Sequence, residues 1–275
     1  MDNNKSDGQR NCKGRGEEYT SIKINDNYNF DEIKSKLNTE IIGQSEAIEK
    51  IINQLKITKT TNQPSAIMLF SGSSGVGKSE MAKQLAKCLS RKLIRLDMSE
   101  YKDSSSVQKI IGAAPGYVGY DKPSLLLGQL QIYPKSIILL DEIDKACQDV
   151  INIFLHVFDE GFLEDSHKRK VDFRNTIIIM TTNQSCVKGK LGFKKNTISK
   201  LNNYRFSEDL LTRIDEIINF KNLTKTDLKK IIRKNINHEI KEEDIQNILK
   251  DYDIKQQARG IIKKANKYFQ CKVKT

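Results

Sequence analysis

The sequence has few of the residues that define several common classes of protein. It contains four prolines, three histidines and no tryptophan among 275 residues. No apolar run approaches the roughly 20 residues that span a membrane. The five cysteines are odd in number and scattered, and none forms a Cys-x-x-Cys pair. This argues against a disulfide framework or zinc site and favours a reducing compartment. What remains is a folded chain with one large domain, or a large and a small one.

Positive charge is in excess, and it is concentrated near the carboxyl end. The net charge is +12, and residues 221–275 contain 15 Lys and Arg against 7 Asp and Glu. A nucleic-acid surface is one interpretation, but aromatic side chains that could stack on bases are not interleaved there. A solvated, Lys-rich helical surface is favoured, so neither a nucleic-acid nor a membrane partner is expected.

One glycine-rich stretch carries the strongest functional signal. The sequence from Gly72 to Ser79 fits G-x-x-x-x-G-K-[ST], with an apolar run before it and a helical segment after it. Glycines let the backbone approach phosphate oxygens, and backbone N–H groups at a helix N-terminus attract them. We expect Lys78 to reach the β- and γ-phosphates of ATP or GTP and Ser79 to ligate Mg²⁺. The expected nucleotide-binding residues are Gly72, Ser73, Ser74, Gly75, Val76, Gly77, Lys78 and Ser79.

Apolar runs alternate with helical segments along the middle of the chain. Strands are expected at 66–70, 93–97, 136–140, 176–181 and 216–220. This alternation predicts an α/β fold in which helices cover both faces of a parallel sheet. From Thr224, a candidate N-cap, the pattern is helical to about Phe269. The expected domains are a disordered polar lead-in at 1–29, an α/β nucleotide-binding domain at 30–221 and a small helical domain at 222–275.

Two carboxylates follow the apolar run at 136–140. Acids at the carboxyl end of such a strand lie where open parallel sheets bind ligands. Asp141 is expected to hold Mg²⁺, largely through water, and Glu142 to act as the general base on the attacking water. The next apolar run ends at Asn183, whose uncharged amide can orient that water without competing for its proton.

Together these segments resemble the second ATPase module of the ClpA, ClpB and ClpC unfoldases, with ClpC and ClpA the nearer. The resemblance runs from about residue 31 to 269 and depends on the segments 96–101, 111–121, 139–146 and 171–183. It implies a P-loop AAA+ fold with ATP and Mg²⁺ as cofactors. It also implies a homo- or hetero-hexamer of Clp ATPase subunits that threads unfolded polypeptide through a pore.

The resemblance assigns roles to two further apolar or aromatic segments. Ile41 and Ile42 match the segment that packs on adenine. Tyr117 and Val118 match the pore loop that grips the translocating chain, where an exposed aromatic side chain gives sequence-tolerant contact.

Two arginines also match residues of this family. Arg213 matches the arginine finger that reaches the γ-phosphate in the neighbouring subunit, where a guanidinium stabilises developing charge. Arg259 matches the arginine of the small domain that senses bound nucleotide, although Gln257 replaces the usual glycine. We also expect the small domain to be shorter at its carboxyl end than is usual in the family.

An apolar tripeptide, Leu191, Gly192 and Phe193, lies in a lysine-rich loop. Apolar residues exposed in this way often mark a partner site. The tripeptide resembles the motif by which ClpA-, ClpC- and ClpX-type unfoldases dock on the ClpP peptidase. The alternative is a loop anchor packed on its own domain.

These observations predict an ATP hydrolase, namely a Clp-type unfoldase or chaperone subunit that delivers polypeptide to a ClpP-like peptidase and has no peptidase activity itself. Three alternatives stay open: a ClpB-like chaperone without a peptidase, a reduced ATP-binding structural partner of a fuller Clp subunit, and a nucleic-acid-dependent ATPase. Lys, Asn and Ile usage indicates an AT-rich genome. An organelle-encoded protein of the plastid stroma and a bacterial cytoplasmic protein both fit.

Overall fold

The computed structural model describes residues 28–57, 63–117, 120, 124–184, 206–236, 241–250, 252–253 and 256–272. Val118, the tripeptide Leu191, Gly192 and Phe193, and most of the expected lead-in lie outside these residues. Their assignments therefore stay predictions. Within the described part of the chain, no helix is both long and apolar enough to span a membrane.

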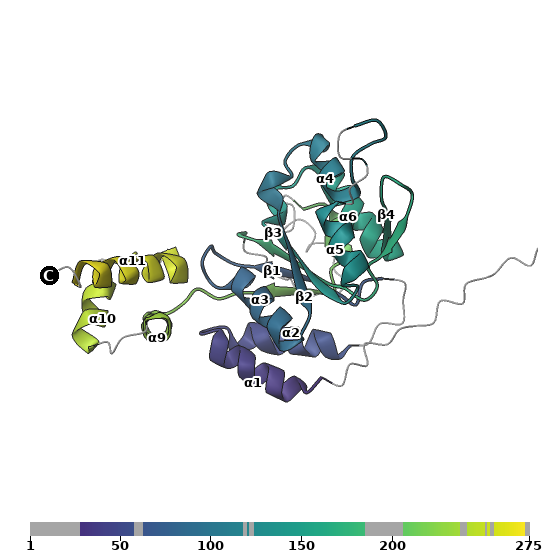
Figure 1. Cartoon of the computed structure of the whole chain (residues 1–275). Coiled ribbons are helices and arrows are strands. Elements are labelled where there is room, and N and C mark those ends of the chain that lie inside the picture. The colour runs from purple at the N-terminus through teal and green to yellow at the C-terminus, as the bar shows by residue number, and fades with distance from the viewer. Residues whose placement is uncertain are drawn as a thin grey trace, which may run out of the picture.

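A five-stranded parallel sheet forms the centre of the molecule (Figure 1). Its strand order is β2-β3-β6-β1-β7, and each neighbouring pair is parallel. The strands are β1 (Ala66–Ser71), β2 (Lys92–Asp97), β3 (Ser136–Asp141), β6 (Ile177–Thr182) and β7 (Glu216–Asn219). Every residue of β1, β3 and β6 is buried, as expected for strands covered on both faces. The predicted parallel sheet is confirmed.

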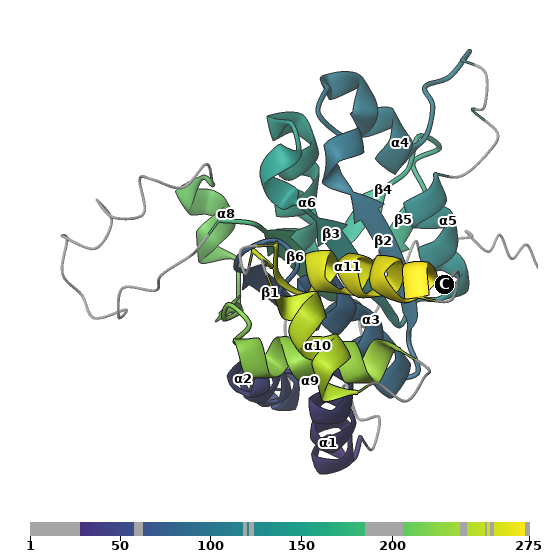
Figure 2. The ribbon, with the colours of Figure 1, turned by 90° about the vertical axis from the view of Figure 1, so that its left-hand side faces the viewer.

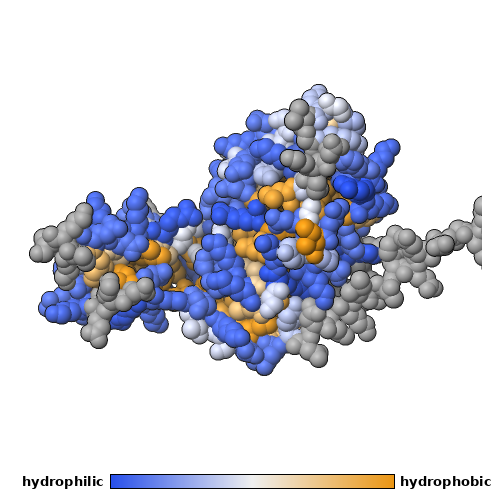
Figure 3. All heavy atoms as spheres, in the orientation of Figure 1, coloured by the Kyte–Doolittle hydropathy of each residue, from blue (hydrophilic) through white to orange (hydrophobic). Residues whose placement is uncertain are grey.

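Helices cover both faces of this sheet, and alternate residues of each strand face opposite layers. Met68 and Phe70 of β1 pack with α1 (Phe30–Glu40), α2 (Ser45–Lys56) and α3 (Lys78–Cys88). Ile67 and Leu69 pack with the opposite layer, in a core that includes residues of α4 (Val107–Ile111), α5 (Leu125–Ile132), α6 (Gln148–Glu160) and α8 (Glu208–Thr212). Short 3-10 helices occur at Met98–Glu100, Ser104–Ser106 and Ile143–Lys145. In the view of Figure 3, hydrophilic residues cover most of the described surface.

A small antiparallel hairpin follows α6, formed by β4 (Phe162–Glu164) and β5 (Lys170–Asp172). This hairpin was not predicted from the sequence. Asp165 holds its turn, because one carboxylate oxygen accepts from the backbone N–H groups of His167 and Arg169 at 2.9 and 2.8 Å. Lys168 in this turn has a positive φ of 60°, which is uncommon for a residue other than glycine.

The carboxyl-terminal part is helical and has its own buried core. It contains α9 (Lys225–Asn235), α10 (Glu242–Leu249) and α11 (Gln257–Lys272), which we call the helical unit. A capping box between Thr224 and Asp227 begins α9, so the predicted N-cap is confirmed. Figure 2 shows α11 crossing in front of the sheet. The domain boundary at residue 222 stays a prediction.

Candidate functional site

The glycine-rich loop connects β1 to α3, as the sequence pattern predicts. Gly72 and Gly77 have φ angles of 143° and 105°, which glycine adopts without steric strain. A Cβ at Gly72 would lie 2.7 Å from the carbonyl oxygen of Phe220, so a side chain there would clash with the backbone. The loop therefore follows a path that glycine permits, and Lys78 is the first residue of α3.

The Lys78 ammonium is buried among oxygen acceptors. Its Nζ donates to the carbonyl oxygens of Gly72 and Ser73 at 2.6 and 2.9 Å and to Asn183 Oδ1 at 3.0 Å. Burial lowers the pKa of Lys78 to about 8, although the negative charges of Asp141 and Glu142 act in the opposite direction. The positive charge of the Lys78 ammonium is thus only partly balanced by the groups around it, a condition that favours an anionic ligand.

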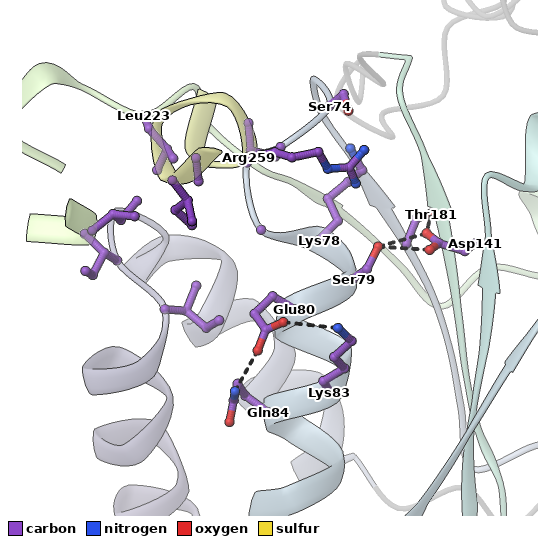
Figure 4. Close-up of a pocket in the computed structure, with 18 of the residues that line it drawn as sticks. Ser74, Lys78, Ser79, Glu80, Lys83, Gln84, Asp141, Thr181, Leu223 and Arg259 are labelled. Atoms are coloured by element: carbon purple, nitrogen blue, oxygen red, sulfur yellow. Dashed lines mark hydrogen bonds and ion pairs between the residues drawn. The ribbon is translucent and has the colours of Figure 1, made fainter. Parts of the chain in front are cut away.

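Ser79 and Asp141, predicted as metal ligands, lie in direct contact. Ser79 Oγ donates to Asp141 Oδ1 at 2.9 Å, and Figure 4 shows the two side chains facing each other across the gap between α3 and the sheet. Thr181 Oγ1 also donates to Asp141 Oδ1, at 2.6 Å. Hydroxyl and carboxylate oxygens are the donors that Mg²⁺ prefers, so these residues fit the expected cation.

Two partners of Asp141 were not predicted from the sequence. Besides Thr181 on β6, Arg95 on β2 donates from Nη2 to Asp141 Oδ2 at 2.7 Å. Both strands flank β3 in the sheet, and in the β2–β3 register Asp97 pairs with Asp141. The side chains of Arg95 and Thr181 therefore reach the Asp141 carboxylate from the two strands that flank β3. The strand order that brings them there has no signal in the local sequence.

Glu142 and Asn183, predicted to act on water, are joined by a hydrogen bond. Asn183 Nδ2 donates to Glu142 Oε1 at 3.0 Å, while Asn183 Oδ1 accepts from Lys78. Glu142 has a left-handed backbone with φ 57°, and its N–H donates to Thr181 Oγ1 at 2.9 Å. The amide of Asn183 thus links the phosphate-loop lysine to the carboxylate proposed as general base.

These groups line one cavity of about 670 Å³ between the sheet and the helical unit. Ile41 and Ile42 line it as well, and Arg259 extends from α11 toward Lys78 (Figure 4). The cavity also has apolar walls that were not predicted from the sequence, formed by Leu223 just before α9 and by Ile231, Ala258 and Ile262 of the helical unit.

Arg213 and Tyr117 lie apart from these residues and do not line the cavity. Arg213 Nε donates to Asp159 Oδ1 at 2.7 Å, and this hydrogen bond lowers the pKa of the Asp159 carboxyl. Arg213 Nη1 donates to the carbonyl oxygen of Asp209 at 2.7 Å. Tyr117 is 67% exposed.

The family model of the AAA domain (Cdc48 subfamily) matches residues 63–217, more than half of the chain. The chain belongs to this AAA family. The match covers Lys78, Asp141, Glu142, Asn183 and Arg213, and it ends before the helical unit begins.

This AAA chain is also similar to curated Clp proteins of bacteria. It is 41% identical over 209 residues to chaperone protein ClpB of Mycoplasmoides gallisepticum, an alignment that covers 74% of this chain and 29% of the relative. It is 42% identical over 212 residues to the ATP-dependent Clp protease ATP-binding subunit ClpE of Lactococcus lactis, covering 71% and 28%. It is 41% identical over 237 residues to ClpB of Clostridium tetani, covering 81% and 27%.

The AAA chain spans between a quarter and a third of the length of these relatives. The resemblance to Clp ATPases and the predicted fold class are confirmed. A nearer likeness to ClpC or ClpA and a plastid origin stay predictions.

Proposed function

We propose that this AAA chain binds ATP with Mg²⁺, hydrolyses it, and works as an ATPase subunit of a Clp-type unfoldase or chaperone. The observation that carries the proposal is the Asn183 side chain, which joins Lys78 to Glu142 inside one cavity. Phosphate binding and water activation need these two groups on opposite sides of the same phosphoryl group.

Each group has a proposed role in phosphoryl transfer. The loop from Gly72 to Ser79 binds phosphate oxygens, with Lys78 supplying positive charge. Ser79 and Asp141 hold Mg²⁺, which when bound neutralises phosphate charge. Glu142 accepts the proton of the attacking water, and Asn183 orients that water through its amide.

Further residues of the cavity are proposed to contact the adenine base and to sense bound nucleotide. Ile41 and Ile42 form an apolar surface there, which suits the flat face of adenine. Arg259 lies close enough to Lys78 for its charge to disfavour the lysine ammonium, and we propose that both side chains contact phosphate.

The residues outside the cavity support action between subunits. Arg213 is proposed to complete a neighbouring subunit's site, and Tyr117 and Val118 are proposed to contact polypeptide in the pore of a homo- or hetero-hexamer. Leu191, Gly192 and Phe193 are proposed to dock a ClpP-like peptidase. The similarity to ClpB as well as ClpE keeps a chaperone without a peptidase as the second candidate.

ATP turnover, measured over a range of protein concentrations, tests this proposal. Specific activity should rise with concentration, because Arg213 acts only after subunits associate. Glu142→Gln should bind nucleotide but lose turnover by at least about 100-fold, the usual size of a general-base effect. Flat, near-zero turnover in a chain that binds ATP would overturn the hydrolase and favour a structural partner of a fuller subunit.

A further inference from the structure

The segment that connects β7 to α9 runs beside the phosphate loop. We call it the linker, residues 220–223. The backbone N–H of Phe220 donates to the carbonyl oxygen of Ser71 at 2.7 Å. Ser73 Oγ donates to Asn222 Oδ1 at 2.5 Å. The linker therefore lies against the end of β1 and the start of the phosphate loop.

The buried side chain of Gln44 holds the linker from one side. Gln44 precedes α2 and is 2% exposed. Its Nε2 donates to the carbonyl oxygens of Lys221 and Val76 at 2.8 and 3.2 Å, and its Oε1 accepts from the Lys221 N–H at 3.1 Å. One amide thus pairs with both backbone groups of Lys221 and with the phosphate loop. Buried groups that lose such partners are strongly disfavoured.

Gln257 holds the linker from the other side. Its Oε1 accepts from the Leu223 N–H at 2.7 Å, and the side chain is 2% exposed. Its φ of 51° is uncommon for a residue other than glycine, so its side-chain contact offsets a disfavoured backbone. The next residue, Ala258, donates its N–H to the carbonyl oxygen of Gly75 in the phosphate loop at 3.1 Å.

We infer that Gln44 and Gln257 are positioning residues that clamp the linker to the phosphate loop and so hold the helical unit over bound nucleotide. This inference rests on the proposed nucleotide binding. Leu223 of the linker lines the cavity, and so do Ile231 and Arg259 of the helical unit. When the clamp is intact, these residues keep their place over the nucleotide. When it is broken, that wall moves and the nucleotide leaves faster.

The test is the rate at which the full chain releases a fluorescent ADP, measured by stopped flow, together with KM and kcat for ATP. Gln44→Met and Gln257→Met remove the hydrogen bonds at nearly constant volume. Each should release ADP about 5- to 30-fold faster and raise KM in proportion, as expected when Gln257→Met loses the bond to Leu223 and Gln44→Met loses its three bonds. The kcat should not fall by more than about twofold, since Lys78 and Glu142 are untouched.

Two further variants separate positioning from packing. Gln54→Met changes a buried glutamine of α2 that does not line the cavity, and its release rate should match the wild type. Gln257→Glu keeps an oxygen that can accept from the Leu223 N–H, so its release rate should return toward the wild-type value. Gln257→Met and Gln257→Glu alone decide the matter if Gln44→Met fails to fold.

Two results would overturn the clamp. One is wild-type release in folded Gln44→Met and Gln257→Met. The other is release from Gln257→Glu as fast as from Gln257→Met, because packing alone would then explain the effect. A wild-type chain that binds no fluorescent ADP would instead overturn the proposed function, so the two failures are distinguishable.

Discussion

Arg95 and Asp141 form an ion pair inside the candidate site, with Arg95 Nη2 2.7 Å from Asp141 Oδ2. The Asp141 side chain is 9% exposed, whereas that of Arg95 is 48% exposed. The Arg95 guanidinium thus lies at the open side of the buried Asp141 carboxylate and donates a hydrogen bond to one of its two oxygens. Since Asp141 is proposed to hold Mg²⁺, a fixed positive charge beside it should oppose cation binding.

Replacing Arg95 with methionine should therefore tighten the binding of Mg²⁺ to the nucleotide-loaded chain. We expect an increase of about three- to tenfold, a modest effect because Arg95 is half exposed and screened by solvent. The measurement is a Mg²⁺ titration of fluorescent-ATP binding. Lys83→Met is the matched control, because Lys83 lines the same cavity but pairs with Glu80 at 3.4 Å. Weaker Mg²⁺ binding in Arg95→Met would contradict the idea that Arg95 opposes the cation. It would indicate instead that the guanidinium contacts the nucleotide.

Arg95 also marks the limit of what the sequence could predict. The phosphate loop and the Asp141–Glu142 pair depend on short segments in which strand, turn and helix follow one another. Their positions could be predicted locally. Arg95 and Thr181 reach Asp141 only because β3 lies between β2 and β6. That order is set by packing of the whole sheet.

The hairpin after α6 was missed for a different reason. Its strands are three residues long, too short to show an alternating pattern. Its turn depends on the Asp165 carboxylate and on a lysine with positive φ, and neither matches a common turn sequence. The clamp formed by Gln44 and Gln257 could not be predicted from the sequence either, since each side chain contacts backbone groups far away in the sequence.

Nucleotide affinity should depend on pH through Lys78, whose pKa burial lowers to about 8. Phosphate oxygens favour the ammonium, so bound nucleotide raises this pKa. Below pH 8 the ammonium is already formed. Above pH 8 binding must take up a proton, and affinity should fall by up to about tenfold per pH unit. Fluorescent-ATP titrations between about pH 7 and 9.5 measure this. The control is Lys78→Met, whose affinity should not change with pH in this way because the variant has no ammonium.

The same shift affects folding in the absence of nucleotide. The unfolded chain binds the Lys78 proton more tightly than the folded chain does. The contribution of Lys78 to the free energy of unfolding should therefore rise with pH between about 8 and 10.5.

In the nucleotide titrations, a wild-type affinity that changes with pH as little as that of Lys78→Met would contradict the assignment of Lys78 to phosphate.

Asn183 should affect hydrolysis more than binding. In Asn183→Ala, Lys78 keeps its contacts with the carbonyl oxygens of Gly72 and Ser73, so nucleotide affinity should change by less than about threefold. Turnover should fall by about 10- to 100-fold, because the water and Glu142 lose their common partner. Asn183→Asp should be no better, since a carboxylate cannot donate to Glu142.

Equilibrium binding and steady-state turnover of these two variants, measured side by side, separate the effects. Gln184→Ala is the control, as it changes the next residue and leaves the Lys78–Asn183–Glu142 contacts intact. Full turnover in Asn183→Ala would remove Asn183 from the proposed chemistry.

Tyr117 should matter for polypeptide handling and not for ATP hydrolysis. Tyr117→Ala should keep most turnover, because Tyr117 does not line the cavity, but should lose ATP-driven unfolding of a fluorescent protein with an unstructured tail. Tyr117→Phe should retain unfolding, since the aromatic ring supplies the grip. Tyr133→Ala, which removes another exposed tyrosine, serves as the control. Equal unfolding by Tyr117→Ala and wild type would remove Tyr117 from the pore.

Arg213 should act on the site of a neighbouring subunit. Arg213→Ala should bind nucleotide normally, because Arg213 pairs with Asp159 outside its own cavity, and should lose most turnover. Arg233→Ala, which breaks a pair with Glu242 on the helical unit, is the matched control and should stay active.

Mixing two inactive variants gives the sharpest test of Arg213. Chains with Arg213→Ala keep Glu142, and chains with Glu142→Gln keep Arg213. In a random equimolar ring about a quarter of the sites would combine the intact Glu142 of one chain with the intact Arg213 of the next. Turnover should therefore reappear on mixing and increase with total protein concentration. A mixture as inactive as its components, under conditions where the wild-type chain assembles, would show that Arg213 does not complete a neighbour's site.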